Sequence, residues 1–318
     1  MIFCFKLEKT IVTQSWTILG AGAVGHLLAC RFAQQHMSAS LIYRNKSLAN
    51  QSLVNYQFND STEQYAINYR SLEQLEPIDY LLLTVKSFQV ETAIKAVREQ
   101  LTTGCEIFLL QNGMGTLEKV TRLLANHIQP KQIHPGVNNH GVYLKESKTG
   151  MIEVIHAGEG NLVFGNNYLC SENTNSPSGL SSLEKIGLST SWVGNIETRL
   201  WLKVAVNAAI NPLTAINQCL NGQLLESKKL RLQVEQLCKE TTKLFEMLKL
   251  PISEDQIMNE VFRVISKTAN NYSSMMRDKQ AGNSTEIESI TGYLIEKAKL
   301  HGLSLKTHQA LYRSIVSQ

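Results

Sequence analysis

The sequence predicts an α/β protein in two parts, a doubly wound parallel sheet followed by an all-helical domain. Three observations support this: a glycine-rich turn follows the first apolar run, β-type runs alternate with helical stretches up to residue 194, and long segments of 3.6-residue periodicity take over beyond it. We therefore expect an N-terminal tail over residues 1–14, a sheet domain over 15–194 and a helical domain over 195–318. A chain of 318 residues is long enough for both domains.

The first apolar run ends in six residues with the G-x-G-x-x-G spacing: Gly20, Ala21, Gly22, Ala23, Val24 and Gly25. In a strand-turn-helix unit the first glycine allows a tight turn, the second lets a pyrophosphate approach the backbone, and the third lets the helix pack on the strand. The helix N-terminus then favours phosphates. A Rossmann-type dinucleotide site is predicted, and a plain glycine turn is the alternative.

The residue after the second β-type run indicates which dinucleotide is bound. An Asp or Glu about 20 residues after the glycines would bind the ribose hydroxyls of NAD. Here the run over residues 40–43 ends in Arg44, with no carboxylate beside it. An arginine can pair with a 2′-phosphate through its forked donors, so Arg44 favours NADPH or NADP as cofactor. An exposed arginine after an edge strand is the alternative.

Continuous apolar runs over residues 80–85 and 106–110 are typical of parallel strands buried on both faces. Ligands of such sheets bind at the carboxyl ends of the strands, where Lys86 and Asn112 follow these two runs. Lys86 can donate to cofactor oxygens, and Asn112 can hydrogen-bond nicotinamide, ribose or substrate. A solvated lysine and an ordinary Asn-Gly turn are the alternatives.

Shorter elements complete the first half. The β-type runs between residues 133 and 164 predict a meander that extends the main sheet. Further strands are expected at residues 53–58, 65–69 and 190–193, and helices at 87–100 and 180–186.

Composition excludes several classes of function. A net charge of +4 with no dense run of Lys or Arg argues against nucleic acid or a membrane surface as partner. No stretch approaches the roughly 20 apolar residues of a membrane span. The six cysteines contain no CxxC pair and the eight histidines no HxxxH or HExxH pattern, so we expect no metal and no disulfide framework. These features suit a cytoplasmic protein.

The helix that opens the second half carries a polar stripe. From residue 199 to residue 211 the polar residues are Arg199, Lys203, Asn207 and Asn211, four apart on an otherwise apolar helix. Such a helix is buried, so its polar stripe faces a cavity, a partner or a thin strip of water. Buried lysine and asparagine need hydrogen-bond partners, which a small polar ligand can supply. The exposed seam of an amphipathic helix is the alternative, although asparagine is a poor helix former.

Three further helices are expected, at residues 224–248, 254–270 and 285–301. Ser253 and Gln256 have capping-box spacing before the second of them, and Gly302 suits the C′ position after the third. The polar run over residues 270–278 is interpreted as a loop or a helix end. Glu286 follows a candidate N-cap, and the pattern alone gives it the structural role of a first-turn carboxylate.

From Trp16 onward the chain resembles the ketopantoate reductase (2-dehydropantoate 2-reductase) family over nearly its full length. The resemblance is specific because many segments match in the family's order. They are Gly20–Gly25, Thr84–Gln89, Asn112–Gly115, Leu200–Asn207, Ile210–Ala215, Asn221–Gly222, Ser273–Met275 and Thr285–Ile287. The resemblance implies NADPH-dependent reduction of ketopantoate, a small 2-keto acid, to pantoate in pantothenate biosynthesis, at a site between the two domains.

The resemblance also implies roles for single residues. Lys203 would be the general acid, with Glu286 near Lys203, substrate and cofactor. Substrate would be held by Lys203, Asn207, Asn211, Asn221 and Ser274. NADPH would be held by Gly20, Ala21, Gly22, Ala23, Val24, Gly25, Arg44, Lys86, Asn112, Val142 and Glu286. The family tends to have two small residues after His140, so Val142 departs from its pattern.

The chemistry of such a reduction fits these residue types. Hydride addition to a 2-keto acid places negative charge on the carbonyl oxygen, and a lysine ammonium bonded to that oxygen can stabilise the charge and supply the proton. Two alternatives stay open: a reductase of another branched 2-keto acid, and a non-catalytic NADPH-binding sensor, in which we would expect a broken stripe. The helical domain could form a homodimer through an apolar face, but no repeat or heptad specifies one.

Overall fold

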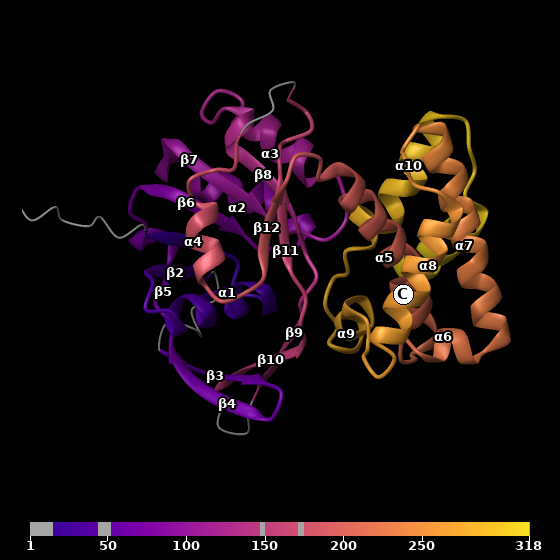
Figure 1. The fold of residues 1–318 in the computed structure, drawn as a ribbon, viewed down its shortest axis with the longest axis horizontal. Helices are drawn as coiled ribbons and strands as arrows, with labels where there is room; N and C mark the ends of the chain where they lie inside the picture. Colours follow the sequence, from indigo (N-terminus) through magenta and orange to yellow (C-terminus); the bar gives the residue numbers. More distant parts are fainter. Residues whose placement is uncertain (1–14, 44–51, 147–149, 171–174, 318) are drawn as a thin grey trace, which may run out of the picture.

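The computed structural model describes residues 15–43, 52–146, 150–170 and 175–317. A half built around β-sheets and a helical half lie side by side, and α5 (Glu197–Asn217) leads from the first into the second (Figure 1). The predicted fold class, a Rossmann-type sheet followed by a helical domain, is confirmed.

The main sheet has eight strands: β1 (Trp16–Leu19), β2 (Ala39–Ile42), β5 (Tyr69–Arg70), β6 (Ile78–Leu83), β7 (Leu101–Leu109), β8 (Ile133–Asn138), β11 (Leu162–Gly165) and β12 (Thr190–Val193). Their order is β12-β11-β8-β7-β6-β1-β2-β5. Neighbouring strands are parallel except β8 and β11. The order reverses beside β1, which places the glycine turn at the switch point where dinucleotides bind in such sheets.

Helices cover both faces of this sheet: α1 (Ala23–Gln34), α2 (Val90–Val97), α3 (Thr116–Leu124) and α4 (Leu180–Lys185). Leu82 and Phe108 pack with α1 and α4, whereas Leu81 and Ile107 pack with α2 and α3. Successive side chains of a strand point to opposite faces, so burial on both faces explains the continuous apolar runs. The helix expected at 87–100 is shorter, because 3₁₀ turns flank α2 on both sides.

A second sheet corrects the expected meander. Its strands are β3 (Leu53–Phe58), β4 (Ser61–Ala66), β9 (Gly141–Glu146) and β10 (Ile152–Gly158), in the order β4-β3-β10-β9. Only β8 and β11 extend the main sheet, because β10 pairs in parallel with β3 instead. Val54 and Val154 of this sheet are buried in the same core as α1. The strand expected at 65–69 is likewise divided between the end of β4 and the start of β5.

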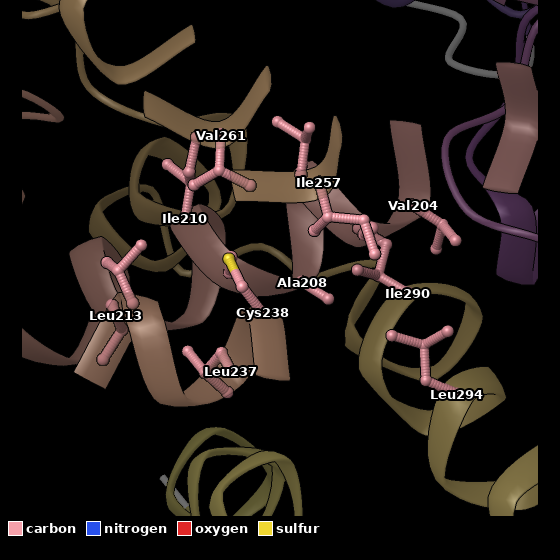
Figure 2. Packing of buried hydrophobic residues seen from close by; sticks show 14 of the residues in the cluster. Val204, Ala208, Ile210, Leu213, Leu237, Cys238, Ile257, Val261, Ile290 and Leu294 are labelled. Atoms are coloured by element: carbon pink, nitrogen blue, oxygen red, sulfur yellow. The ribbon is translucent and has the colours of Figure 1, made fainter. Parts of the chain in front are cut away.

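The helical half packs around α5. Its other helices are α6 (Gln223–Glu226), α7 (Lys228–Met247), α8 (Glu254–Lys267), α9 (Ser274–Gln280), α10 (Tyr293–Leu300) and α11 (Lys306–Val316), with a π-helical turn at Glu288–Gly292. Figure 2 shows apolar side chains of α5, among them Val204, Ala208 and Ile210, meeting those of α7, α8 and α10. This burial holds α5 rigidly, and its polar stripe with it.

Several helix boundaries differ from the expected ones. The helix expected at 224–248 is interrupted at Ser227, whose hydroxyl accepts a hydrogen bond from the Leu230 amide and caps α7. The polar run at 270–278 contains the start of α9, the helix expected at 285–301 begins with the π-helical turn, and α11 was not expected. The capping box of Ser253 and Gln256 is confirmed by hydrogen bonds of 2.8 and 3.2 Å.

Candidate active site

The glycine turn has the geometry that a dinucleotide requires. Gly20 has a φ of +131°, and a Cβ there would lie 2.6 Å from the Val85 amide. A Cβ on Gly25 would overlap the Gly20 carbonyl oxygen, because α1 passes directly over β1. A Cβ on Gly22 would meet nothing within 4 Å, and no side chain caps the N-terminus of α1. The turn therefore leaves open space and free N–H groups for a pyrophosphate.

Lys86 extends from the end of β6 toward the helical half. Its Nζ lies 2.5 Å from Oδ1 of Asp278 on α9 and 3.3 Å from the Ser284 carbonyl oxygen. This side chain is 35% exposed and is ion-paired with Asp278. Its predicted contact with the cofactor stays a prediction.

Glu286 joins the ends of two strands of the main sheet to the helical half. Its Oε1 accepts a hydrogen bond from the Ser87 amide at 3.0 Å, and its Oε2 accepts one from the Asn112 side-chain amide at 3.2 Å. Burial raises the pKa of Glu286, and these hydrogen bonds oppose the rise. Glu286 is therefore more than a first-turn carboxylate at the start of a helix.

The π-helical turn packs directly on the Asn-Gly segment. Gly113 has a φ of +84°, and a Cβ there would overlap the Ser289 carbonyl oxygen, which accepts a hydrogen bond from the Met114 amide at 2.8 Å. The Ser289 and Ser87 hydroxyl oxygens lie 2.8 Å apart. Asn112 is thus held against the segment that carries Glu286.

Lys203 lies on α5 at the junction of the two halves. Its Nζ donates a hydrogen bond of 2.6 Å to the carbonyl oxygen of Asn138, the last residue of β8. Burial lowers the pKa of Lys203 to about 8, and the charge of Glu286 acts in the opposite direction. At neutral pH the amine is therefore mainly protonated, as a general acid must be, and can lose its proton at modest cost.

The loop after Asn138 is fixed by hydrogen bonds of neutral groups. The Asn138 side-chain oxygen accepts a bond from the His140 amide at 2.9 Å, and His140 Nδ1 accepts one from the Gly160 amide at 3.1 Å. Burial lowers the pKa of His140 to about 4, so this ring is uncharged near neutral pH. The acceptor for Lys203 is consequently held in place over the physiological pH range.

The three predicted substrate asparagines of the helical half are buried to different degrees. Asn211 and Asn221 are 7% and 6% exposed, whereas Asn207 is partly exposed. Within the described residues, the Asn207 and Asn211 side chains have no hydrogen-bond partner. The Asn221 amide nitrogen donates to the Thr268 hydroxyl at 2.8 Å, but its oxygen is buried without a partner. Unpartnered amides of this kind are suited to a polar ligand.

Ser274 is exposed at the first residue of α9, and its neighbour Ser273 has the structural role. The Ser273 hydroxyl accepts a hydrogen bond from the Met276 amide at 3.1 Å and lies 2.7 Å from the Thr214 hydroxyl of α5. This contact ties α9 to the helix that carries Lys203. Ser274 is left free to reach a ligand.

One predicted cofactor residue lies outside the described residues, and another lies in the second sheet. Arg44 lies outside the described residues. Val142 pairs with His156 in the second sheet, and its side chain packs against the core beneath α1. A cavity of about 770 Å³ beside β12, lined by Trp192 and Glu184 among others, involves none of the predicted site residues.

Sequence reasoning missed Asn138, Asp278 and Ser289. Asn138 acts through its backbone oxygen, which leaves no signal in the residue type. Asp278 and Ser289 are ordinary polar residues whose partners lie 192 and 202 positions earlier. In the part of the chain that the structure describes, no helix is long and apolar enough to span a bilayer, and no three His, Cys, Asp or Glu side chains are grouped to hold a metal ion.

Comparison with known proteins identifies the family. The profile of the family described as ketopantoate reductase PanE/ApbA matches residues 16–168, and the profile of its C-terminal part matches residues 195–317. The 2-dehydropantoate 2-reductase of Salmonella typhimurium is 32% identical over 313 residues, which cover 94% of this chain and 93% of that protein.

Solved structures agree with this fold. A probable 2-dehydropantoate 2-reductase of Bacillus subtilis is 26% identical, with a TM-score of 0.73 over 95% of this chain and 99% of that one. A ketopantoate reductase of Staphylococcus aureus, described as dimeric, is 20% identical, with a TM-score of 0.77 over 95% of this chain and 98% of that one. The chain belongs to the ketopantoate reductase family.

Proposed function

We propose that this protein reduces ketopantoate to (R)-pantoate with NADPH, in pantothenate biosynthesis. The observation that carries the proposal is the position of Lys203, a partly buried amine with a lowered pKa that faces the charge of Glu286 where the two halves meet. Open space at Gly22 suits the approach of a dinucleotide, and the unpartnered amides on α5 suit hydrogen bonds to a polar substrate. Membership of the ketopantoate reductase family supports this substrate.

NADPH fits the residues of the sheet half. The backbone of Gly20 to Gly25 and the N-terminus of α1 would hold the pyrophosphate, and Arg44 the 2′-phosphate. Lys86, Asn112, Val142 and Glu286 are the other proposed contacts. When bound, NADPH supplies the hydride that reduces the carbonyl carbon.

Lys203 supplies the proton in this scheme. As the carbonyl carbon gains hydride, the electron pair of the C=O π bond moves to oxygen, and that oxygen takes a proton from Lys203 Nζ. The ammonium has three N–H donors, so it can keep its hydrogen bond to the Asn138 carbonyl oxygen while another N–H is directed at the substrate oxygen. Lys203 then regains a proton from solvent. The Asn207, Asn211 and Asn221 amides and the Ser274 hydroxyl would hold the substrate's polar groups.

Three further assignments belong to the same proposal. The helical domain begins at residue 195, directly after the last strand and before α5. The protein works in the cytoplasm, and two copies form a homodimer, as the S. aureus relative is described.

The test is loss of NADPH absorbance with purified protein and ketopantoate, beside NADH and 2-ketoisovalerate. We expect fast turnover only with NADPH and ketopantoate. Turnover of 2-ketoisovalerate but not of ketopantoate would indicate that the substrate is another branched 2-keto acid. Tight NADPH binding with no turnover of any keto acid would favour a non-catalytic sensor.

A further inference from the structure

Helix α9 contacts both sides of the junction between the two halves (Figure 1). Its N-cap Ser273 is tied to α5, and its Asp278 is paired with Lys86 at the end of β6. Its Arg277 contacts the second sheet, because the guanidinium carbon lies 3.8 Å from the centroid of the Tyr143 ring in β9. The short helix thus joins three parts of the molecule.

The Arg277 guanidinium stacks on the Tyr143 ring but has no anionic partner among the described residues. Within the described residues it has no carboxylate at ion-pair distance, and none of its five N–H donors has a protein acceptor. By contrast, Arg70, Arg231 and Arg263 each pair with a glutamate at 2.6 to 3.1 Å on the surface. Arg277 is also partly buried, where unused donors cost more than at the surface. Stacking leaves the edges of the guanidinium available to a planar anion.

Arg277 is close to two parts of the proposed substrate site. Ser274 is three residues earlier on the same helix, so both side chains share one face of α9. Tyr143, whose ring contacts the guanidinium, is in β9, and this strand begins three residues after Asn138, whose carbonyl oxygen accepts a hydrogen bond from Lys203. The guanidinium therefore lies between the helix that carries Ser274 and the strand that follows the acceptor of Lys203.

Arg277 differs in charge balance from the two lysines of the junction. The Lys86 ammonium is neutralised by Asp278, and Lys203 faces Glu286. Among the described residues Arg277 has no such carboxylate, and a 2-keto acid brings one negative charge. A guanidinium can bind both oxygens of a carboxylate at once.

We propose that Arg277 binds the carboxylate of the 2-keto acid substrate, with the Tyr143 ring supporting the guanidinium from one face. The residue thereby selects charged keto acids over neutral carbonyl compounds. This inference rests on the proposed function and names a substrate contact beyond the polar stripe of α5.

The experiment measures binding of ketopantoate to the protein saturated with NADP⁺, by calorimetry. This pair cannot react, so affinity is measured whether or not the enzyme turns over. We expect Arg277→Gln to weaken ketopantoate binding about 10- to 100-fold, the usual effect of losing hydrogen bonds to a charged group. Arg277→Lys should recover only part of the loss, because an ammonium cannot bind a carboxylate at two points or stack in the same way.

The controls separate recognition from folding. Arg263→Gln removes a surface arginine paired with Glu260 and should leave ketopantoate affinity unchanged. Binding of the uncharged lactone of ketopantoate should change less than about twofold in Arg277→Gln, because only the carboxylate contact is lost. Unchanged affinity for ketopantoate, or equal loss for acid and lactone, would overturn the proposal.

Other outcomes distinguish an error in the proposed substrate contact from an error in the proposed reaction. Loss of NADP⁺ affinity in Arg277→Gln, with ketopantoate affinity retained, would show that the guanidinium binds a cofactor phosphate and overturn the substrate contact. Arg277-dependent binding without turnover would overturn the proposed reaction and support this inference. Absence of ketopantoate binding by the unmodified protein would overturn both.

Discussion

The glycine turn and the junction around α9 are both proposed ligand sites, and the two are built by opposite means. At the turn, contiguous residues fix the backbone, because a Cβ on Gly20 or Gly25 would collide with atoms of the same strand-turn-helix unit or of the next strand. At the junction, residues almost 200 positions apart meet through single hydrogen bonds, as the Ser87 backbone amide and the Glu286 carboxylate do. Backbone sterics thus specify the first region, and tertiary packing specifies the second.

The strongest test of the junction is Lys203→Ala. We expect kcat to fall about 10³-fold, because both the proton donor and the charge facing the developing oxyanion are lost. The dissociation constant of NADPH, measured by fluorescence titration, should change less than twofold. Lys243→Ala, which removes an exposed lysine of α7, is the matched control and should leave kcat unchanged. Equal losses in kcat and NADPH affinity would contradict the assigned role.

A pair of glycine variants tests the turn. In Gly25→Ala the new Cβ overlaps the Gly20 carbonyl oxygen, so the free energy of unfolding should fall by about 3 kcal/mol in urea titrations. In Gly22→Ala the Cβ meets open space, so stability should change by about 0.5 kcal/mol or less. NADPH affinity should nevertheless drop about tenfold in Gly22→Ala, because the Cβ occupies the approach of the pyrophosphate. Equal destabilisation by both substitutions would refute this account of the turn.

The pH dependence of kcat tests the coupling of Lys203 to Glu286. A general acid must be protonated, so kcat should fall as pH rises through about 8, the pKa of Lys203. The Glu286 carboxylate stabilises the ammonium, so Glu286→Gln should lower that pKa and move the fall in kcat to lower pH. Glu288→Gln, at an exposed neighbouring position, should leave the profile in place. If Glu286→Gln and the unmodified protein have the same dependence of kcat on pH, Lys203 and Glu286 are not coupled.

The smallest effect is expected at the Lys86–Asp278 ion pair. The two side chains are 35% and 18% exposed, so Asp278→Asn should lower the free energy of unfolding by about 1 kcal/mol, and less at high salt. Glu76→Gln removes the partner of Arg70 in a more exposed pair and should cost about 0.5 kcal/mol or less. Urea titrations of both variants at two salt concentrations measure this difference. If the two substitutions lower the free energy of unfolding equally, burial at the junction does not strengthen the Lys86–Asp278 ion pair.

The elements that could be predicted from the sequence depend on neighbours in the chain. The glycine turn, the strand over 190–193, the capping box at Ser253 and the left-handed Gly302 all follow from local rules, and the structure contains each of them. The polar stripe of α5 was visible for the same reason, since helical periodicity aligns Lys203, Asn207 and Asn211.

The missed features depend on partners far away in the chain. The second sheet forms because β10 pairs with β3, about 100 residues earlier, and no residue in either strand signals that choice. The division of the 224–248 helix is an exception, because it depends on the local cap at Ser227, and serine favours an N-cap over a helix interior. Helix α9 begins in a Ser/Asn-rich run that favours turns in isolation, and its packing on α5 decides the outcome.

Because of the π-helical turn, the position of Glu286 depends on how many residues this turn contains as well as on which residues they are. A π-helical turn holds one residue more than an α-helical turn, and each residue of an α-helix rotates the chain by about 100°. Deleting Thr291 from this turn would keep every side chain given a role above and yet turn the Glu286 carboxylate away from Ser87 and Asn112. In this family member, deletion of one residue that has no proposed ligand contact would disconnect the two halves of the site.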